Sequence, residues 1–114
     1  MNSLRFFVFL MVAGATTSAL ACDYPPLVSI PEGADATMEE LLTAQAGIRE
    51  YMAAMEVYLA CVDDELTAAG DDAPAEFRSI MESRYNAAVS EMEAVAAGFN
   101  EEIQAYREAN PDAG

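Results

Sequence analysis

Two long stretches of the chain repeat apolar residues at alternating intervals of three and four, and this spacing constrains the fold more than any other feature. Such a repeat places the apolar side chains in one line along an α-helix. In the first stretch the line is interrupted only by a glutamine and contains Met38, Leu41, Gln45, Ile48, Met52, Met55, Leu59, Val62 and Leu66. In the second it contains Phe77, Met81, Tyr85, Ala88, Met92, Val95, Phe99, Ile103 and Tyr106. The sequence therefore predicts two long amphipathic helices.

Capping signals give the expected ends of the first helix. Thr37 followed by Glu40 has the spacing of a capping box, in which each side chain accepts a hydrogen bond from a free backbone amide. Gly70 is the expected stop, because glycine readily ends a helix. These signals predict a first helix over residues 38–69.

The second helix is expected over residues 74–109, beginning at Pro74 and ending at Asn110-Pro111. Because the connection between the helices is short, they should pack antiparallel. The predicted fold class is all-α. It is a long antiparallel two-helix hairpin, similar to a coiled coil, over residues 37–110, followed by a short tail at 111–114.

The first 21 residues have the three-part layout of a cleavable secretory signal peptide. Arg5 supplies a positive start, residues 6–15 form an apolar run, and Ala19-Leu20-Ala21 fits the A-x-A cleavage site. A run of about ten apolar residues is half of the roughly 20 that cross a bilayer, so a cleaved signal is favoured over an anchor. We therefore expect an exported protein, in the periplasm or outside the cell. Removing 21 of 114 residues leaves 93, enough for one domain.

The segment 22–36 contains three prolines and a glycine, so we expect an extended arm before the first helix. It begins at Cys22, and the one other cysteine of the chain is Cys61 in the first helix. Exported proteins usually oxidise such a pair. Thr37 to Cys61 spans about 36 Å of helix, whereas the arm reaches about 47 Å in polyproline form. A Cys22–Cys61 disulfide is therefore predicted, with the arm running antiparallel to the first helix.

The alternative for Cys22 is lipidation, because it directly follows the proposed cleavage site, as the acylated cysteine of a bacterial lipoprotein does. The usual lipobox has leucine three residues before the cysteine, where this chain has Ala19, with Leu20 one place later. A lipid on Cys22 excludes a bond to Cys61. The protein would then be an envelope lipoprotein with a structural or accessory role.

The charge balance excludes several function classes. Without residues 1–21 the formal net charge moves from −15 to −16, because only Arg5 is lost, and no lysine or histidine is present. Such a surface repels nucleic acid and anionic membranes. We therefore expect no nucleic-acid partner, and no direct binding to a membrane surface unless Cys22 is lipidated.

Motifs for catalysis and cofactor binding are absent from the sequence. No histidine, free cysteine with a base, glycine-rich phosphate loop or zinc-ligand set is present, so we expect no enzyme, cofactor or catalytic residue. An enzyme working through carboxylates, tyrosine or arginine would need a cleft. The acidic residues near the turn, Asp63, Asp64, Glu65, Asp71 and Asp72, lack EF-hand spacing, so we expect a solvated tip and no metal site.

Several apolar residues of the first helix lie off its main line, notably Leu42, Tyr51 and Tyr58. A two-helix hairpin has a single seam, so these side chains need cover from the proline-rich arm or from a second molecule. We expect them to be candidate partner-facing residues. The predicted function is that of a small acidic exported interaction protein, which binds a protein partner or associates with itself.

Several short patterns resemble those of a family of small exported proteobacterial proteins to which no activity is attached. They span most of the chain after residue 21: Cys22-Asp23-Tyr24-Pro25, Ile30-Pro31-Glu32-Gly33, Ala36-Thr37, Ala44-Gln45, Tyr58-Leu59-Ala60-Cys61, Arg84-Tyr85-Asn86-Ala87-Ala88-Val89 and Phe99-Asn100-Glu101. The lysine-free acidity departs from the pattern of that family. The resemblance implies export and the cysteine pair, and it carries over no catalytic residue.

Overall fold

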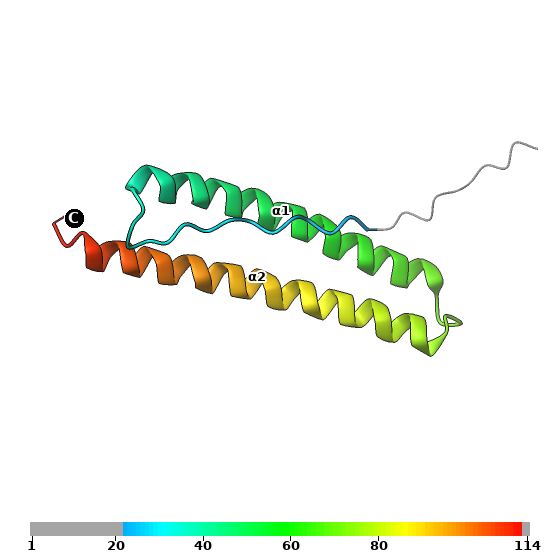
Figure 1. Ribbon diagram of the computed structural model, residues 1–114. Helices are drawn as coiled ribbons and strands as arrows, with labels where there is room; N and C mark the ends of the chain where they lie inside the picture. The colour runs from blue at the N-terminus through cyan, green and yellow to red at the C-terminus, as the bar shows by residue number, and fades with distance from the viewer. Residues whose placement is uncertain (1–21, 113–114) are drawn as a thin grey trace, which may run out of the picture.

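The structure, a computed structural model, describes residues 22–112, so the predicted signal peptide lies outside the described residues. Two helices, α1 (Met38–Ala69) and α2 (Ala75–Ala109), run antiparallel and are joined by a short turn (Figure 1). Contacts between the helices extend along the hairpin. The prediction of an all-α helical hairpin is confirmed.

The helix ends follow from the residues that cap them. Thr37 Oγ1 accepts a hydrogen bond from the Glu40 amide at 3.1 Å, and the Glu40 carboxylate accepts one from the Thr37 amide at 3.0 Å. Gly70 ends α1 with φ of +70°, a left-handed conformation that glycine adopts without a steric penalty. Pro74 is the N-cap of α2, so this helix begins one residue later than predicted. Asn110 is its C-cap, and its side chain donates to the Tyr106 carbonyl at 2.9 Å.

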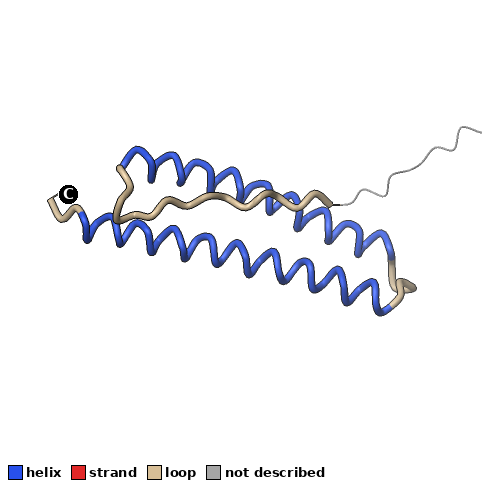
Figure 2. The backbone as a smooth tube through the Cα atoms, viewed as in Figure 1, coloured by secondary structure: helices blue, strands red, loops and turns tan. Residues whose placement is uncertain are grey.

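The arm, residues 22–36, runs back along α1 between the two helices (Figure 2); it is extended as predicted up to residue 32 and then forms a turn at residues 33–35 that leads into α1. It contacts both of them. Gly47 of α1 lies next to Val28, and Gly98 of α2 lies next to Ile30. A Cβ atom at either glycine would lie 3.7 Å from the arm residue, which is an ordinary van der Waals distance, so the arm packs closely on both helices. The arm is thus a third layer on one face of the hairpin.

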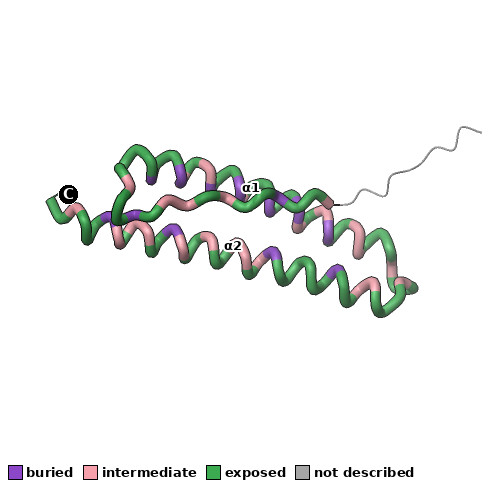
Figure 3. Tube along the Cα trace, in the orientation of Figure 1, coloured by how far each residue is buried: buried purple, intermediate pink, exposed green. Residues whose placement is uncertain are grey.

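The core follows a row of α1 residues at intervals of seven, Leu41, Ile48, Met55 and Val62, all of them buried. These four were predicted. The predicted flank of this row, at positions 45, 52 and 59, is only partly buried, whereas the flank at Ala44, Tyr51 and Tyr58 is buried. The reason is the arm, which covers the second flank, while α2 covers only part of the first. Figure 3 shows the buried positions at intervals along both helices.

Two members of the predicted lines are a further correction. Met38 is 49% exposed and Tyr85 is 38% exposed, so neither is a core residue. In α2 the buried residues are Met81, Ala88, Phe99 and Tyr106. They form two clusters with α1, one near the middle and the turn and one at the open end of the hairpin.

Gly33 provides a test of how tightly the arm is seated. A Cβ atom at this position would lie 1.7 Å from the Glu102 backbone carbonyl oxygen, so Gly33→Ala forces the arm away from α2. We expect a loss of about 1–3 kcal/mol in the free energy of unfolding, the range of overpacking substitutions. Urea unfolding measures it.

The matched control is Gly98→Ala. Its Cβ would lie 3.7 Å from Ile30, which is ordinary contact, and alanine favours a helix interior by up to about 1 kcal/mol. This variant should be neutral or stabilised. Equal stability of the two variants would show that the arm does not rest against Glu102.

Candidate functional site

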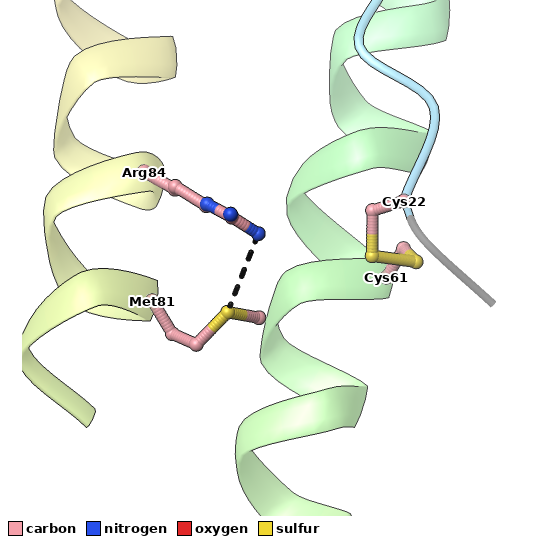
Figure 4. The surroundings of a disulfide bond; sticks show 4 residues. All are labelled: Cys22, Cys61, Met81 and Arg84. Carbon is pink, nitrogen blue, oxygen red and sulfur yellow. Dashed lines mark hydrogen bonds between the residues drawn. A yellow bond between two sulfur atoms is a disulfide. The ribbon is translucent and has the colours of Figure 1, made fainter. Parts of the chain in front are cut away.

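A disulfide between Cys22 and Cys61 fixes the start of the arm to α1, with 5.7 Å between the two Cα atoms. Figure 4 shows the bond beside α1, with Arg84 and Met81 projecting from the neighbouring α2. The predicted pair is therefore bonded in the structure. A sulfur in this bond is not available for a lipid, so the two fates proposed for Cys22 exclude each other within one molecule.

Glu65 lies beside this disulfide, because it follows Cys61 by one helical turn. One oxygen of its carboxylate and the two sulfur atoms lie within 4.8 Å of one another. This is the one cluster of potential metal ligands among residues 22–112. In the oxidised protein both sulfurs are bonded to each other, so the cluster lacks the two thiolates that a soft metal ion would need. The acidic residues at the turn form no comparable cluster within the described part of the chain.

The carboxylate of Glu91, a residue of α2, lies beside two tyrosines, Tyr24 and Tyr51, and a third tyrosine packs against Tyr24. The Tyr24 hydroxyl of the arm donates a hydrogen bond to Glu91 Oε2, and the Tyr24 ring packs edge-on against Tyr58, with 4.9 Å between the ring centroids. Tyr51 faces the same carboxylate. Within residues 22–112, however, neither the buried Tyr51 hydroxyl nor Glu91 Oε1 has a hydrogen-bond partner of normal geometry. The polar cluster is half satisfied.

This environment changes the acidity of two tyrosines. Burial first, and then the negative charge of Glu91, raise the pKa of Tyr51 above its usual 10.0. The pKa of Tyr24 is raised as well, by desolvation and then by its hydrogen bond to Glu91. Both phenols thus keep their protons to a higher pH than a free tyrosine does.

The three candidate partner-facing residues have different positions. Leu42 is 57% exposed, whereas Tyr51 and Tyr58 are 5% and 6% exposed. The arm, and not a second molecule, covers the two tyrosines in this structure, so the first of the two predicted alternatives holds for them. Leu42 is the member of the set that remains open to solvent.

A second face of the hairpin, on the side away from the arm, keeps apolar side chains at its surface. We call it the uncovered face. Its members are Met38, Leu42 and Tyr85, which are exposed, and Leu66 and Ile103, which are partly buried. No arm residue lines the two hollows on this face, whereas arm residues line the hollows on the other side. The uncovered face is the candidate binding surface.

One of the two hollows is a groove between the start of α1 and the end of α2, which we call the end groove. Its volume is about 290 Å³. It is lined by apolar Met38, Leu41, Leu42, Phe99, Ile103 and Tyr106 and by polar Gln45 and Arg107.

Sequence reasoning did not find Glu91, Tyr24 or the end groove. Glu91 lies three residues after Ala88 and four before Val95, both of which are on the α2 line, and this spacing places a carboxylate at the edge of the seam. That position was the available signal. The groove depends on which helix faces meet, which the spacing alone does not give.

Comparison with protein-family models, with curated proteins and with solved structures finds no match to this chain. The resemblance described from its short patterns therefore stays a prediction. Among the described residues, neither helix is sufficiently long and apolar to span a membrane.

Removal of the disulfide by Cys22→Ser/Cys61→Ser tests the anchoring of the arm. The bond joins residues 39 apart, and closing a loop of this length stabilises a fold by about 4 kcal/mol in the chain-entropy model. We expect the double variant to lose much of its stability in urea unfolding. Wild-type protein treated with a dithiol reductant should match it, and equal midpoints for oxidised and reduced protein would contradict the prediction.

Alkaline pH should destabilise the fold through Tyr24 and Tyr51. Their folded-state pKa values are raised above the unfolded value of 10.0, so their contribution is fully present below pH 10 and is lost as the pH rises through the folded pKa values. Tyrosinate absorbance, compared with Tyr24→Phe and Tyr51→Phe, measures the two titrations. Glu91→Gln removes the neighbouring charge and should move both back toward 10. An unchanged titration in this variant would rule out the Glu91 contribution.

Proposed function

We propose that this chain is a small exported interaction protein, which binds a protein partner through its uncovered face. The observation that supports the proposal is that apolar side chains are buried on one face of the hairpin and exposed on the other. The arm buries Tyr51 and Tyr58 on one side, while Met38 and Leu42 on the other remain about half exposed. Large apolar side chains grouped beside a groove are typical of surfaces that bind another molecule.

The charge of the protein favours one type of partner. With 20 acidic residues against five arginines in the full chain, its surface attracts proteins of positive net charge and repels a second copy of itself. A basic protein with an apolar contact surface therefore fits better than self-association. The rate of such association should fall as salt is added.

A rigid hairpin suits this role. The disulfide and the arm fix one side of the hairpin, so the uncovered face is presented with little conformational freedom, and less entropy is lost on binding. Export, through the predicted signal peptide, is part of the proposal because a persistent disulfide requires an oxidising compartment.

Leu42→Glu tests the proposal directly. Purified oxidised protein is immobilised and exposed to an extract of the cells that produce it, and the captured proteins are compared by quantitative mass spectrometry. A specific partner should be retained by the wild type and reduced about tenfold or more by Leu42→Glu, because a carboxylate replaces a leucine in the contact and leaves a buried charge.

The matched control is Val57→Glu. Val57 is also on α1 and is 71% exposed, but it lies outside the hollows of the uncovered face. This variant makes the same change of charge elsewhere and should capture the partner normally. Equal losses in both variants, or a wild-type protein that captures nothing and stays monomeric, would count against the proposal.

A further inference from the structure

We propose that the end groove is a binding site for a free aliphatic carboxylate, whose alkyl chain lies between the helices and whose carboxylate binds Arg107. The proposal concerns a small ligand and does not depend on a protein partner. It follows from the lining of the groove, its charge and its size.

The lining of the groove supplies an apolar wall on both sides. Leu41 and Phe99 form the buried floor, while Met38 and Leu42 stand at the rim with about half of their surface in water. An alkyl chain placed between them would remove this surface from solvent, at roughly 25 cal/mol per Å² of apolar area buried. An apolar chain is therefore the part of a ligand that this groove stabilises.

The charge of the groove differs from that of the rest of the protein. Four other hollows on the described part of the chain each include at least one carboxylate, whereas the end groove includes none and has Arg107 as its charged residue. A basic residue in the last turn of a helix also stabilises the helix dipole, so Arg107 alone would indicate nothing. Arg107 lies at an apolar groove without acidic residues, in a chain of net charge −15, and this position also suits it to bind an anionic group of a ligand.

The pattern of side-chain hydrogen bonds also favours Arg107 as the residue that binds the carboxylate. The side-chain hydrogen bonds found among residues 22–112 involve Arg78 and Arg84 but not Arg107. A guanidinium group presents paired N–H donors that match the two oxygens of a carboxylate. Gln45 also lines the groove and can donate from its amide.

The volume of the groove and the net charge of the protein favour a small ligand that has one alkyl chain and one negative charge. The volume of about 290 Å³ lies at the lower limit of small-molecule sites, roughly 300–1,000 Å³, and suits one alkyl chain. A ligand with one negative charge is also repelled by the acidic protein far less than a second copy of the chain would be. The geometry thus favours a free fatty acid of moderate length over a protein of like charge.

Titration with decanoate, followed by amide chemical shifts in NMR spectra of the purified oxidised protein, tests the site. The concentration is kept below that at which decanoate forms micelles. We expect saturable shifts confined to residues of the end groove, such as Leu42 and Ile103. Arg107→Gln should weaken binding about tenfold, the effect of losing a hydrogen bond to a charged group, and Arg107→Lys should fall between the two.

Two controls make the result specific. Arg84→Gln removes a positive charge elsewhere on α2, where Arg84 contacts Met81, and should bind decanoate as the wild type does. Neutral 1-decanol should bind more weakly than decanoate and should be insensitive to Arg107→Gln. The proposal is overturned if decanoate produces no saturable shift, if the shifts lie outside the groove, or if Arg107→Gln and Arg84→Gln behave alike.

Sedimentation of the same samples separates this result from the proposed protein partner. A monomer that binds decanoate supports the ligand site whatever the capture experiment finds. A dimer whose interface occupies the groove and excludes decanoate overturns it. Because no partner is present in the titration, failure of the partner proposal leaves this measurement unaffected.

Discussion

The Cys22–Cys61 disulfide holds the start of the arm on α1, and the burial of Tyr51 and Tyr58 depends on the arm that it anchors. Two helices share a single seam, so apolar residues on either side of that seam remain exposed to solvent unless a third segment covers them. Here the third segment is neither helix nor strand, and an extended segment of this kind would lose much entropy on ordering. A covalent bond at its start limits that loss, because the chain that precedes α1 is already confined in the unfolded state.

The register of the arm is fixed at its other end by Gly33. Its amide donates to the Glu102 carboxylate, and its α-carbon lies so near the α2 backbone that no Cβ fits there. A slip by one residue would place Glu32 or Ala34 at this point, and both have a Cβ. The same slip would remove the Tyr24 hydroxyl from Glu91 and leave a carboxylate with less compensation under the arm. The disulfide, Gly33 and Glu91 thus specify one position between them.

The spacing of apolar residues and the capping residues were sufficient to predict the helices, and α1 has the predicted bounds. They were not sufficient to predict which flank of α1 is buried. Both flanks of the central row contain large apolar residues, Met52 and Leu59 on one and Tyr51 and Tyr58 on the other, so a helical pattern cannot distinguish them. The arm decides the matter, and its position depends on contacts between residues almost 70 apart, such as Gly33 with Glu102. The end groove was missed for the same reason, because Leu42 and Arg107 lie far apart in the sequence.

The two flanks therefore differ in how far the chain itself covers their apolar residues. On the arm side, the fold itself covers Tyr51 and Tyr58, which are buried inside the chain that carries them. On the other side, α2 reaches Met52 and Leu59 but leaves Leu42 and Met38 exposed, in a chain whose remaining surface is strongly acidic. An acidic surface keeps a protein soluble and keeps like-charged copies apart. Whatever occupies the uncovered face must accordingly combine an apolar contact with a charge that this surface tolerates, either a positive net charge or a single negative group placed at Arg107.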